Sequence, residues 1–230
     1  MNQPNTPDIS FFFAVHQHMR SDLDRYLGSV GGAVESERST RLRSLHRWTT
    51  GFICELEEHH FAEDTFFFPD MRRKVPSSVA IIDGLEADHR RLDELLAAWP
   101  GVSANLADPA VPFDGAKSAA VELAGQLRDL LSVHLDIEDH DVLPLYWRHY
   151  TAAEYDALQA LAVKKSKKKG IWFVAPWNVD NLEGAERAAF LAAAPLPLRA
   201  IHRLVRPRYD RLIAAAFGAT PVAVGETAKR

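Results

Sequence analysis

Residues 57–69 read EEHHFAEDTFFFP, and residues 132–144 read SVHLDIEDHDVLP. In both stretches a histidine stands four residues before a glutamate, an aspartate follows that glutamate, and a proline comes six residues after it. Residues four apart on an α-helix are neighbours on one face, so each histidine and its glutamate form a bidentate pair. The pairs are His59 with Glu63 and His134 with Glu138. The repeated spacing predicts two helices that present equivalent pairs to a shared centre.

Apolar residues recur at steps of three and four around these stretches and in two further segments. The stripes run through residues 12–27, 42–66, 79–96 and 121–145. This period indicates helices that each bury one face, and we expect the second helix to end at Pro69 and the third near Trp99 and Pro100. No sustained alternation bounded by hairpin turns indicates a strand. The sequence therefore predicts an all-α fold, an up-down antiparallel four-helix bundle.

Ionisable residues occupy core positions in all four stripes. Besides the two pairs, a histidine interrupts the first stripe and another interrupts the third. The candidate metal ligands are His16, His59, Glu63, His89, His134 and Glu138. Buried imidazoles and carboxylates carry a desolvation cost unless they are paired or bound to metal. Nitrogen and oxygen donors without a thiolate suit iron, manganese or zinc.

The second helix has an alternative register, because His60 and Asp64 are also four residues apart. Comparison with the stretch around Glu138 favours His59 and Glu63, and makes His60 and Asp64 candidates for orienting the ligands by hydrogen bonds. Glu86, one turn before His89, is expected to be a surface acid, with a role as an extra ligand left open.

Three neighbours of the ligands are assigned from their place on the helices. His18 lies about 200° around its helix from His16 and is expected at the surface. Arg20, four residues after His16, either pairs with an acid at the site or is solvated. Cys54 is expected to be a small buried apolar residue.

The ordered set of motifs resembles the hemerythrin-like (HHE cation-binding) proteins over roughly residues 10 to 150. Its elements are AVHQHMRSDL, EEHHFAEDTFFFP, LEADHRRLDELL and SVHLDIEDHDVLP. The resemblance implies a carboxylate-bridged pair of non-haem iron ions inside the bundle, with an oxo or hydroxo bridge, although other divalent metals suit the same ligands.

One feature departs from the oxygen-carrying members of that family. They have a fifth histidine ligand on the third helix, whereas this chain has Leu85 four residues before His89 and Asp93 four residues after it. Fewer protein ligands leave more exchangeable positions, which favours reactive chemistry over stable oxygen carriage.

Composition narrows the classes of protein. The 230 residues and 47% apolar content suffice for a large core, and the single cysteine excludes an internal disulfide framework. A formal net charge of -4 gives no overall attraction to nucleic acid. The longest apolar runs fall far short of the roughly 20 residues that span a bilayer. With no basic-then-apolar leader, we expect a cytoplasmic protein.

We divide the chain into the bundle, residues 1–150, and a C-terminal helical extension, residues 151–230. Thr151 and Glu154 form a capping box that opens a short helix, which ends in a lysine run expected to be a solvated linker. Ile171–Trp177 is too apolar for water and is expected to pack over one end of the bundle.

Two or three further short helices are expected, one around Glu183 to Ala193 and the others between Pro197 and Phe217, with Gly218 as a terminator and a mobile tail after it. Their apolar residues are expected to pack on the bundle or to form a homodimer interface.

These features predict a protein that handles a small ligand at open iron positions, either hydrogen peroxide or nitric oxide. Such an activity would serve defence against oxidative or nitrosative stress. Two alternatives stay open: reversible binding or sensing of oxygen or nitric oxide, and iron storage or sensing without turnover. No nucleic-acid or membrane partner is expected.

Overall fold

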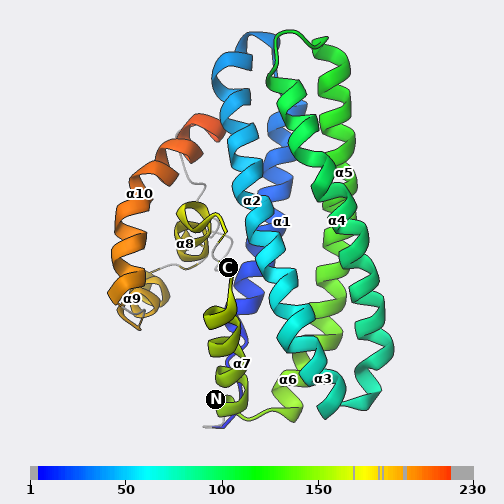
Figure 1. Cartoon of the computed structure of the whole chain (residues 1–230), viewed down its shortest axis with the longest axis vertical. Coiled ribbons are helices and arrows are strands. Elements are labelled where there is room, and N and C mark those ends of the chain that lie inside the picture. The colour runs from blue at the N-terminus through cyan, green and yellow to red at the C-terminus, as the bar shows by residue number, and fades with distance from the viewer. Residues whose placement is uncertain (1–4, 168, 181, 183, 194–195, 219–230) are drawn as a thin grey trace, which may run out of the picture.

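The computed structural model describes residues 5–167, 169–180, 182, 184–193 and 196–218, and Figure 1 shows their arrangement. Every regular element in these ranges is a helix. Four long helices, α1, α2, α4 and α5, run antiparallel as an up-down bundle, and further helices pack beside it. The predicted all-α four-helix bundle with a helical extension is confirmed.

The four long helices are α1 (Ser10–Gly31), α2 (Arg43–Ala62), α4 (Val79–Ala107) and α5 (Phe113–Ile137). Short helical turns precede or join them: η1 (Glu35–Glu37), η2 (Arg38–Leu42), η3 (Glu63–Phe67), η4 (Pro76–Ser78) and η5 (Glu138–Val142). Two short helices continue the second and fourth bundle helices: α3 (Phe68–Lys74) and α6 (Leu143–His149). The extension comprises α7 (Ala152–Lys165), α8 (Ile171–Asp180), α9 (Gly184–Ala193) and α10 (Leu196–Phe217).

The predicted ligands form a polar layer between two hydrophobic clusters. The larger cluster includes Leu56 and Leu131, and the smaller one includes Phe67 and Val142. His59 and His134 each lie between these residues along their helices. The clusters on both sides hold the helices together, so the polar layer need not supply the packing energy itself.

The two HxxxE stretches adopt the same backbone. Each ligand glutamate begins a π-helical turn, η3 or η5, in which an N–H five residues later donates to the glutamate carbonyl: Phe68 to Glu63, and Leu143 to Glu138. A proline, Pro69 or Pro144, follows directly as the second residue of the next helix. Proline lacks an N–H and its ring crowds the carbonyl one turn back, and the wider turn before it relieves both problems.

Two predicted helix ends were wrong. The chain stays helical through Pro69, since the π turn absorbs the proline. The third helix runs past Pro100 to Ala107. The residues after Pro100 are held by tertiary contacts, because Leu106 is 2% exposed and the Ser103 hydroxyl bonds the His46 ring at 2.8 Å. Burial of the following turn offsets the cost of a proline inside the helix.

The extension begins as expected. The Thr151 hydroxyl accepts from the Glu154 N–H at 3.3 Å, and the Glu154 carboxylate accepts from the Thr151 N–H at 2.8 Å, which confirms the capping box. Helix α7 then lies near the end of the bundle where α3 and α6 are found (Figure 1). The Tyr155 ring of α7 packs there against Phe12 and Phe67.

The apolar segment Ile171–Trp177 forms the first part of α8, and it does not cover an end of the bundle. It lies beside α2, about midway along the bundle (Figure 1), with Phe173 against Trp48 and Trp177 against Phe52. That prediction of its position was wrong. The flat face that receives it is created by Gly51, where a Cβ atom would stand 2.3 Å from the Phe173 ring.

Where two or three helices were expected after Glu183, the described residues of this range, 184–193 and 196–217, form α9 and α10. Helix α10 packs against α2 and α8, and Gly218 ends it with a φ of +85°, a backbone conformation that favours glycine. The expected mobile tail after Gly218 lies outside the described residues. Among the described helices, none combines the length and hydropathy needed to span a membrane.

Candidate metal centre

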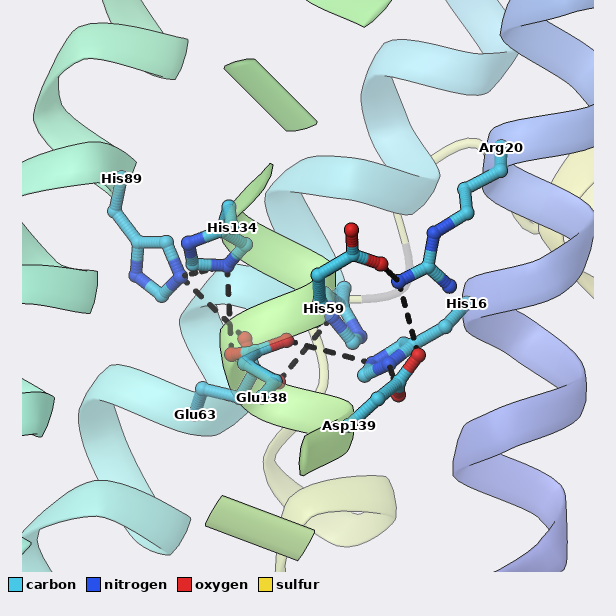
Figure 2. A network of polar contacts seen from close by, with 9 residues as sticks. His16, Arg20, His59, Glu63, His89, His134, Glu138 and Asp139 are labelled. Atoms are coloured by element: carbon cyan, nitrogen blue, oxygen red, sulfur yellow. Dashed lines mark hydrogen bonds and ion pairs between the residues drawn. The ribbon is translucent and has the colours of Figure 1, made fainter. Parts of the chain in front are cut away.

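All six predicted ligands converge in the polar layer, as Figure 2 shows. Helix α1 carries His16, α2 and η3 carry His59 and Glu63, α4 carries His89, and α5 and η5 carry the remaining pair. The histidines and carboxylates are buried, with the His59 side chain the most accessible at 7%. Side chains from all four bundle helices therefore meet in one buried layer.

The ligand atoms divide into two overlapping groups. One contains His16 and His59 with Glu63 and Glu138, and the other contains His89 and His134 with the same two glutamates. Within each group the atoms lie within 4.8 Å of one another. Because both carboxylates belong to both groups, the two groups overlap, and their residues would hold metal at one shared centre.

Distances between the groups fit a cation better than direct hydrogen bonds. Four nitrogen-to-oxygen contacts join the histidines to the glutamates at 3.2 to 3.5 Å. Charge-assisted hydrogen bonds are typically about 2.7–2.9 Å long. Two ligands held about 2.1 Å from one metal ion and at a right angle lie about 3 Å apart. The Nε2 atoms of His89 and His134, 3.2 Å apart, match that spacing as well.

Several of these atoms have no hydrogen-bond partner among the described residues. They are the Nε2 atoms of His16 and His59, Oε2 of Glu63, and both carboxylate oxygens of Glu138. Buried polar atoms are rarely left unpaired, because each one loses its hydration without compensation. A group of such atoms around common points is the donor set that divalent or trivalent metal ions use, so the residues present fit a metal site.

Carboxylates behind the ligands set which ring nitrogen faces the centre. The Asp139 carboxylate lies 2.6 Å from Nδ1 of His16, and the Asp64 carboxylate lies 2.8 Å from Nδ1 of His89. Each aspartate accepts from a protonated Nδ1, which leaves Nε2 as the free ligand atom. Arg20 donates to Asp139 at 2.9 Å and to Asp136 at 2.8 Å, so this arginine belongs to the site and not to solvent.

Burial and mutual repulsion determine the charges in the centre. Burial and the neighbouring Glu138 charge raise the pKa of Glu63 well above its usual range. Burial also raises the pKa of Glu138, but the neighbouring His134 imidazole outweighs it and brings that pKa below its usual range. Burial and the nearby His16 hold the pKa of His59 well below normal, so this ring stays neutral. A cation at the centre would offset the burial and the repulsion that raise the pKa of Glu63.

A cavity of about 10 Å³ adjoins one side of the centre. Its walls are the ligands His16, Glu63 and Glu138 together with apolar and aromatic residues, which are Phe12, Phe67, Phe68, Val142, Leu143 and Tyr146. This volume is about that of one water molecule, so a ligand beside the centre can have only a few atoms. Burial, then Tyr150 and Glu63, raise the pKa of Tyr146 well above its usual range, and the phenol stays protonated.

Sequence reasoning missed Tyr146 and the cavity. The tyrosine lies two steps of four after Glu138, through Val142, and so shares a helix face with a ligand. That spacing was the available signal.

The other candidates lie outside these two groups. Glu86 pairs with Arg72 at 2.7 Å, as a surface acid would. His18 was expected at the surface but is half-buried, since α8 covers it and the Trp177 ring packs against it. Cys54 is half-buried, which differs from the buried apolar role expected for it. His60 is buried against His89.

Comparison with known proteins agrees with this geometry. The family model described as Hemerythrin HHE cation binding domain matches residues 8–146, which contain all six predicted ligands. No curated protein and no solved structure matches the chain. Because the matched region covers more than half of the chain and carries the buried histidine and glutamate clusters, this protein belongs to the hemerythrin HHE cation-binding family.

Proposed function

We propose that the polar layer holds two iron ions and that the protein consumes hydrogen peroxide, with nitric oxide as the other small substrate that fits. The carrying observation is the small cavity walled by His16, Glu63 and Glu138 on one side and by aromatic rings on the other. Ions held by these ligands would supply exchangeable coordination positions and redox chemistry. Disproportionation converts two molecules of peroxide into two of water and one of oxygen, and needs no other reductant.

The chain's own residues give the cavity its selectivity. Phe12, Phe67 and Phe68 line it with apolar surface, which excludes bulk water and strengthens polar interactions inside. Tyr146 lines this space and its hydroxyl has no hydrogen-bond partner among the described residues, so we expect the hydroxyl to donate to a ligand oxygen. Asp139 and Asp64 keep His16 and His89 in the tautomer that presents Nε2 to the centre.

The same cavity supports a second candidate, reversible binding of oxygen or nitric oxide for sensing. Tyr146 is the one polar residue in the cavity wall, apart from the three ligands, among the described residues. A site with so few proton donors can release a bound diatomic molecule unchanged. Iron storage or sensing without turnover predicts neither turnover nor a reversible spectral change.

The test uses the full chain expressed with iron. Metal per chain is quantified, the optical spectrum is recorded, and oxygen release is followed after addition of hydrogen peroxide. We expect about two iron ions per chain and rapid oxygen release, both lost in Glu63→Ala and Glu138→Ala. Glu86→Ala removes a surface acid and serves as the matched control, with metal content and turnover unchanged. Less than about one iron per chain would overturn the di-iron centre.

The spectrum distinguishes the remaining functions. A stable and reversible change with oxygen or nitric oxide, without oxygen release from peroxide, would favour the sensing function. Two bound ions with neither response would favour storage.

A further inference from the structure

His60 is a buried histidine with no role in the six-ligand set. It is 4% exposed, and neither of its ring nitrogens has a hydrogen-bond partner among the described residues. A neutral imidazole has one donor and one acceptor, and burying both unpaired costs the hydration of two polar atoms. A bound metal ion would give one of these nitrogens a partner and offset part of that cost.

The ring lies against the second half of the metal centre. It stacks on the His89 ring with centroids 4.1 Å apart and planes 18° apart, and it lies 5.9 Å from the His134 ring. One nitrogen from each of the three rings lies within 4.8 Å of the other two. The three histidines thus form a third candidate group. It shares His89 and His134 with the group that also contains Glu63 and Glu138.

Helix geometry explains how two adjacent histidines reach different ions. Consecutive residues on an α-helix point about 100° apart. His59 therefore groups with His16 across the bundle, while His60 turns toward His89. One turn of α2 serves both halves of the centre.

We propose that His60 is a seventh ligand, bound to the same metal ion as His89 and His134. The proposal rests on the metal centre described under the proposed function. It gives that ion three imidazoles and leaves the other ion, held by His16 and His59, with two. The cavity is walled by His16 and by neither His89 nor His60. The open position for a small ligand is then confined to the ion on the His16 side.

This assignment revises an expectation based on the third helix. Leu85 and Asp93 occupy the positions on α4 where a second histidine would lie, but His60 on α2 brings a histidine to the same ion. With His60, five histidines would bind the two ions, the fifth coming from α2 instead of α4. The difference in exchangeable positions between the two ions follows from the second helix and not from the third.

The competing role for His60 is packing alone, as a flat ring that holds His89 in place. His60→Phe separates the two roles, because phenylalanine keeps an aromatic ring beside His89 but has no nitrogen. His149→Phe, on an exposed histidine of α6, is the matched control. Circular dichroism and thermal unfolding check that each variant is folded.

The probe is cobalt(II), added to the metal-free full chain. Equilibrium competition with a chelator gives the affinity of each ion, and proton NMR detects imidazole N–H signals shifted by the paramagnetic ion. We expect His60→Phe to lower the affinity for one of the two cobalt ions by at least about 100-fold, since losing a direct ligand costs more affinity than losing an outer-shell contact. One shifted exchangeable N–H signal should vanish, with no loss in His149→Phe.

Equal affinities and an unchanged set of shifted signals in His60→Phe would overturn the proposal and leave His60 as a packing residue. If that variant does not fold, His60→Gly with added imidazole replaces it: recovery of the second cobalt ion supports ligation, and no recovery overturns it. Wild-type protein that binds no cobalt and no iron would contradict the metal centre itself, a separate result from either of these.

Discussion

Asp64 and Asp139 each stand one residue after a ligand glutamate, and each reaches a histidine on another helix. The second bundle helix thereby orients the ligand of the third, and the fourth orients the ligand of the first. Arg20 adds a positive charge behind Asp139, to which it donates at 2.9 Å. At the scale of single residues, the centre depends on these contacts as well as on the ligands.

Asp139→Ala tests this support. Without the carboxylate, the His16 ring loses the partner that sets its tautomer, and we expect the affinity of one metal ion to fall about 10–100-fold. Asp136→Ala is the matched control, because Asp136 also contacts Arg20 but its side chain is 63% exposed and reaches no ligand. Chelator competition measures both variants. Equal loss in the two would assign the effect to Arg20 instead of His16.

Tyr146→Phe tests the donor in the cavity. We expect the fold and the metal content to stay unchanged, while azide binding to the iron-loaded protein weakens about 10-fold. That factor corresponds to the loss of one hydrogen bond of roughly 1.4 kcal/mol. Optical titration measures the binding. An unchanged azide affinity would show that the Tyr146 hydroxyl does not touch the ligand.

Two helical elements have consequences for the site. The π turns η3 and η5 bring glutamate, aspartate and proline into the same backbone arrangement on two helices, which is why their ligands meet as equivalents. Helix α8 covers the middle of α2 and packs on Gly51, which lies about two turns before His59. The π turns form from residues that are neighbours in the sequence, whereas the position of α8 depends on contact between distant segments.

Gly51→Ala tests the seat of α8. The added Cβ would lie 2.3 Å from the Phe173 ring, so α8 must shift, and we expect a loss of about 1–3 kcal/mol in the free energy of unfolding. Gly84→Ala, also inside a helix but with open space around its Cβ, should instead gain up to about 1 kcal/mol. Urea unfolding followed by tryptophan fluorescence measures both. Similar effects of the two substitutions would show that α8 does not rest on Gly51.

The whole molecule joins its C-terminal extension to the bundle through a shared core. Phe173, Trp177 and Tyr209 belong to the same hydrophobic cluster as the bundle residues Trp48 and Phe52. The division at residue 150 stays a prediction about sequence segments, and these contacts show one continuous core across it. Leu196 and Leu204 on α10 are 73% and 81% exposed, which fits the predicted homodimer interface without testing it.

Glu55, at the contact between α2 and α8, makes the stability of the folded protein depend on pH. Its carboxyl is buried and accepts from the Asn178 amide at 2.9 Å, and burial raises its pKa to about 8. The folded state therefore favours the neutral carboxyl, and the unfolded state releases the proton near its ordinary pKa of about 4.3. The stability that Glu55 contributes is fully present below the unfolded-state pKa of about 4.3 and is lost as the pH rises toward the folded-state pKa of about 8.

Glu55→Gln keeps an acceptor for Asn178 and removes the titration. We expect it to raise the free energy of unfolding of the metal-free protein by on the order of 2–3 kcal/mol at about pH 7, with little change at about pH 4. Urea unfolding across that range measures the difference, and Glu57→Gln, on an exposed acid of the same helix, is the control. A gain that is the same at every pH would contradict the assignment to Glu55.

Much of the site could be predicted because its pattern is local. The spacing of four between His59 and Glu63, and between His134 and Glu138, places each pair on one face of any α-helix, whatever surrounds it. The stripes around His16 and His89 identify their buried faces in the same way. These local relations, together with the hydrophobic period, were enough to predict the bundle and its family.

Contacts between helices could not be obtained in this way. Whether His60 faces the centre depends on how α2 is rotated against α4, and Pro100 is accommodated only because Leu106 and Ser103 find partners on other segments. The position of α8 depends on Gly51, a residue without a side chain and therefore without a hydrophobic signal. The sequence by itself determined the helices, their buried faces and the pairing of each histidine with its glutamate. The tertiary structure decided the two overlapping ligand groups, the cavity beside Tyr146 and the place of His60, because these depend on the packing of segments that are distant in the chain.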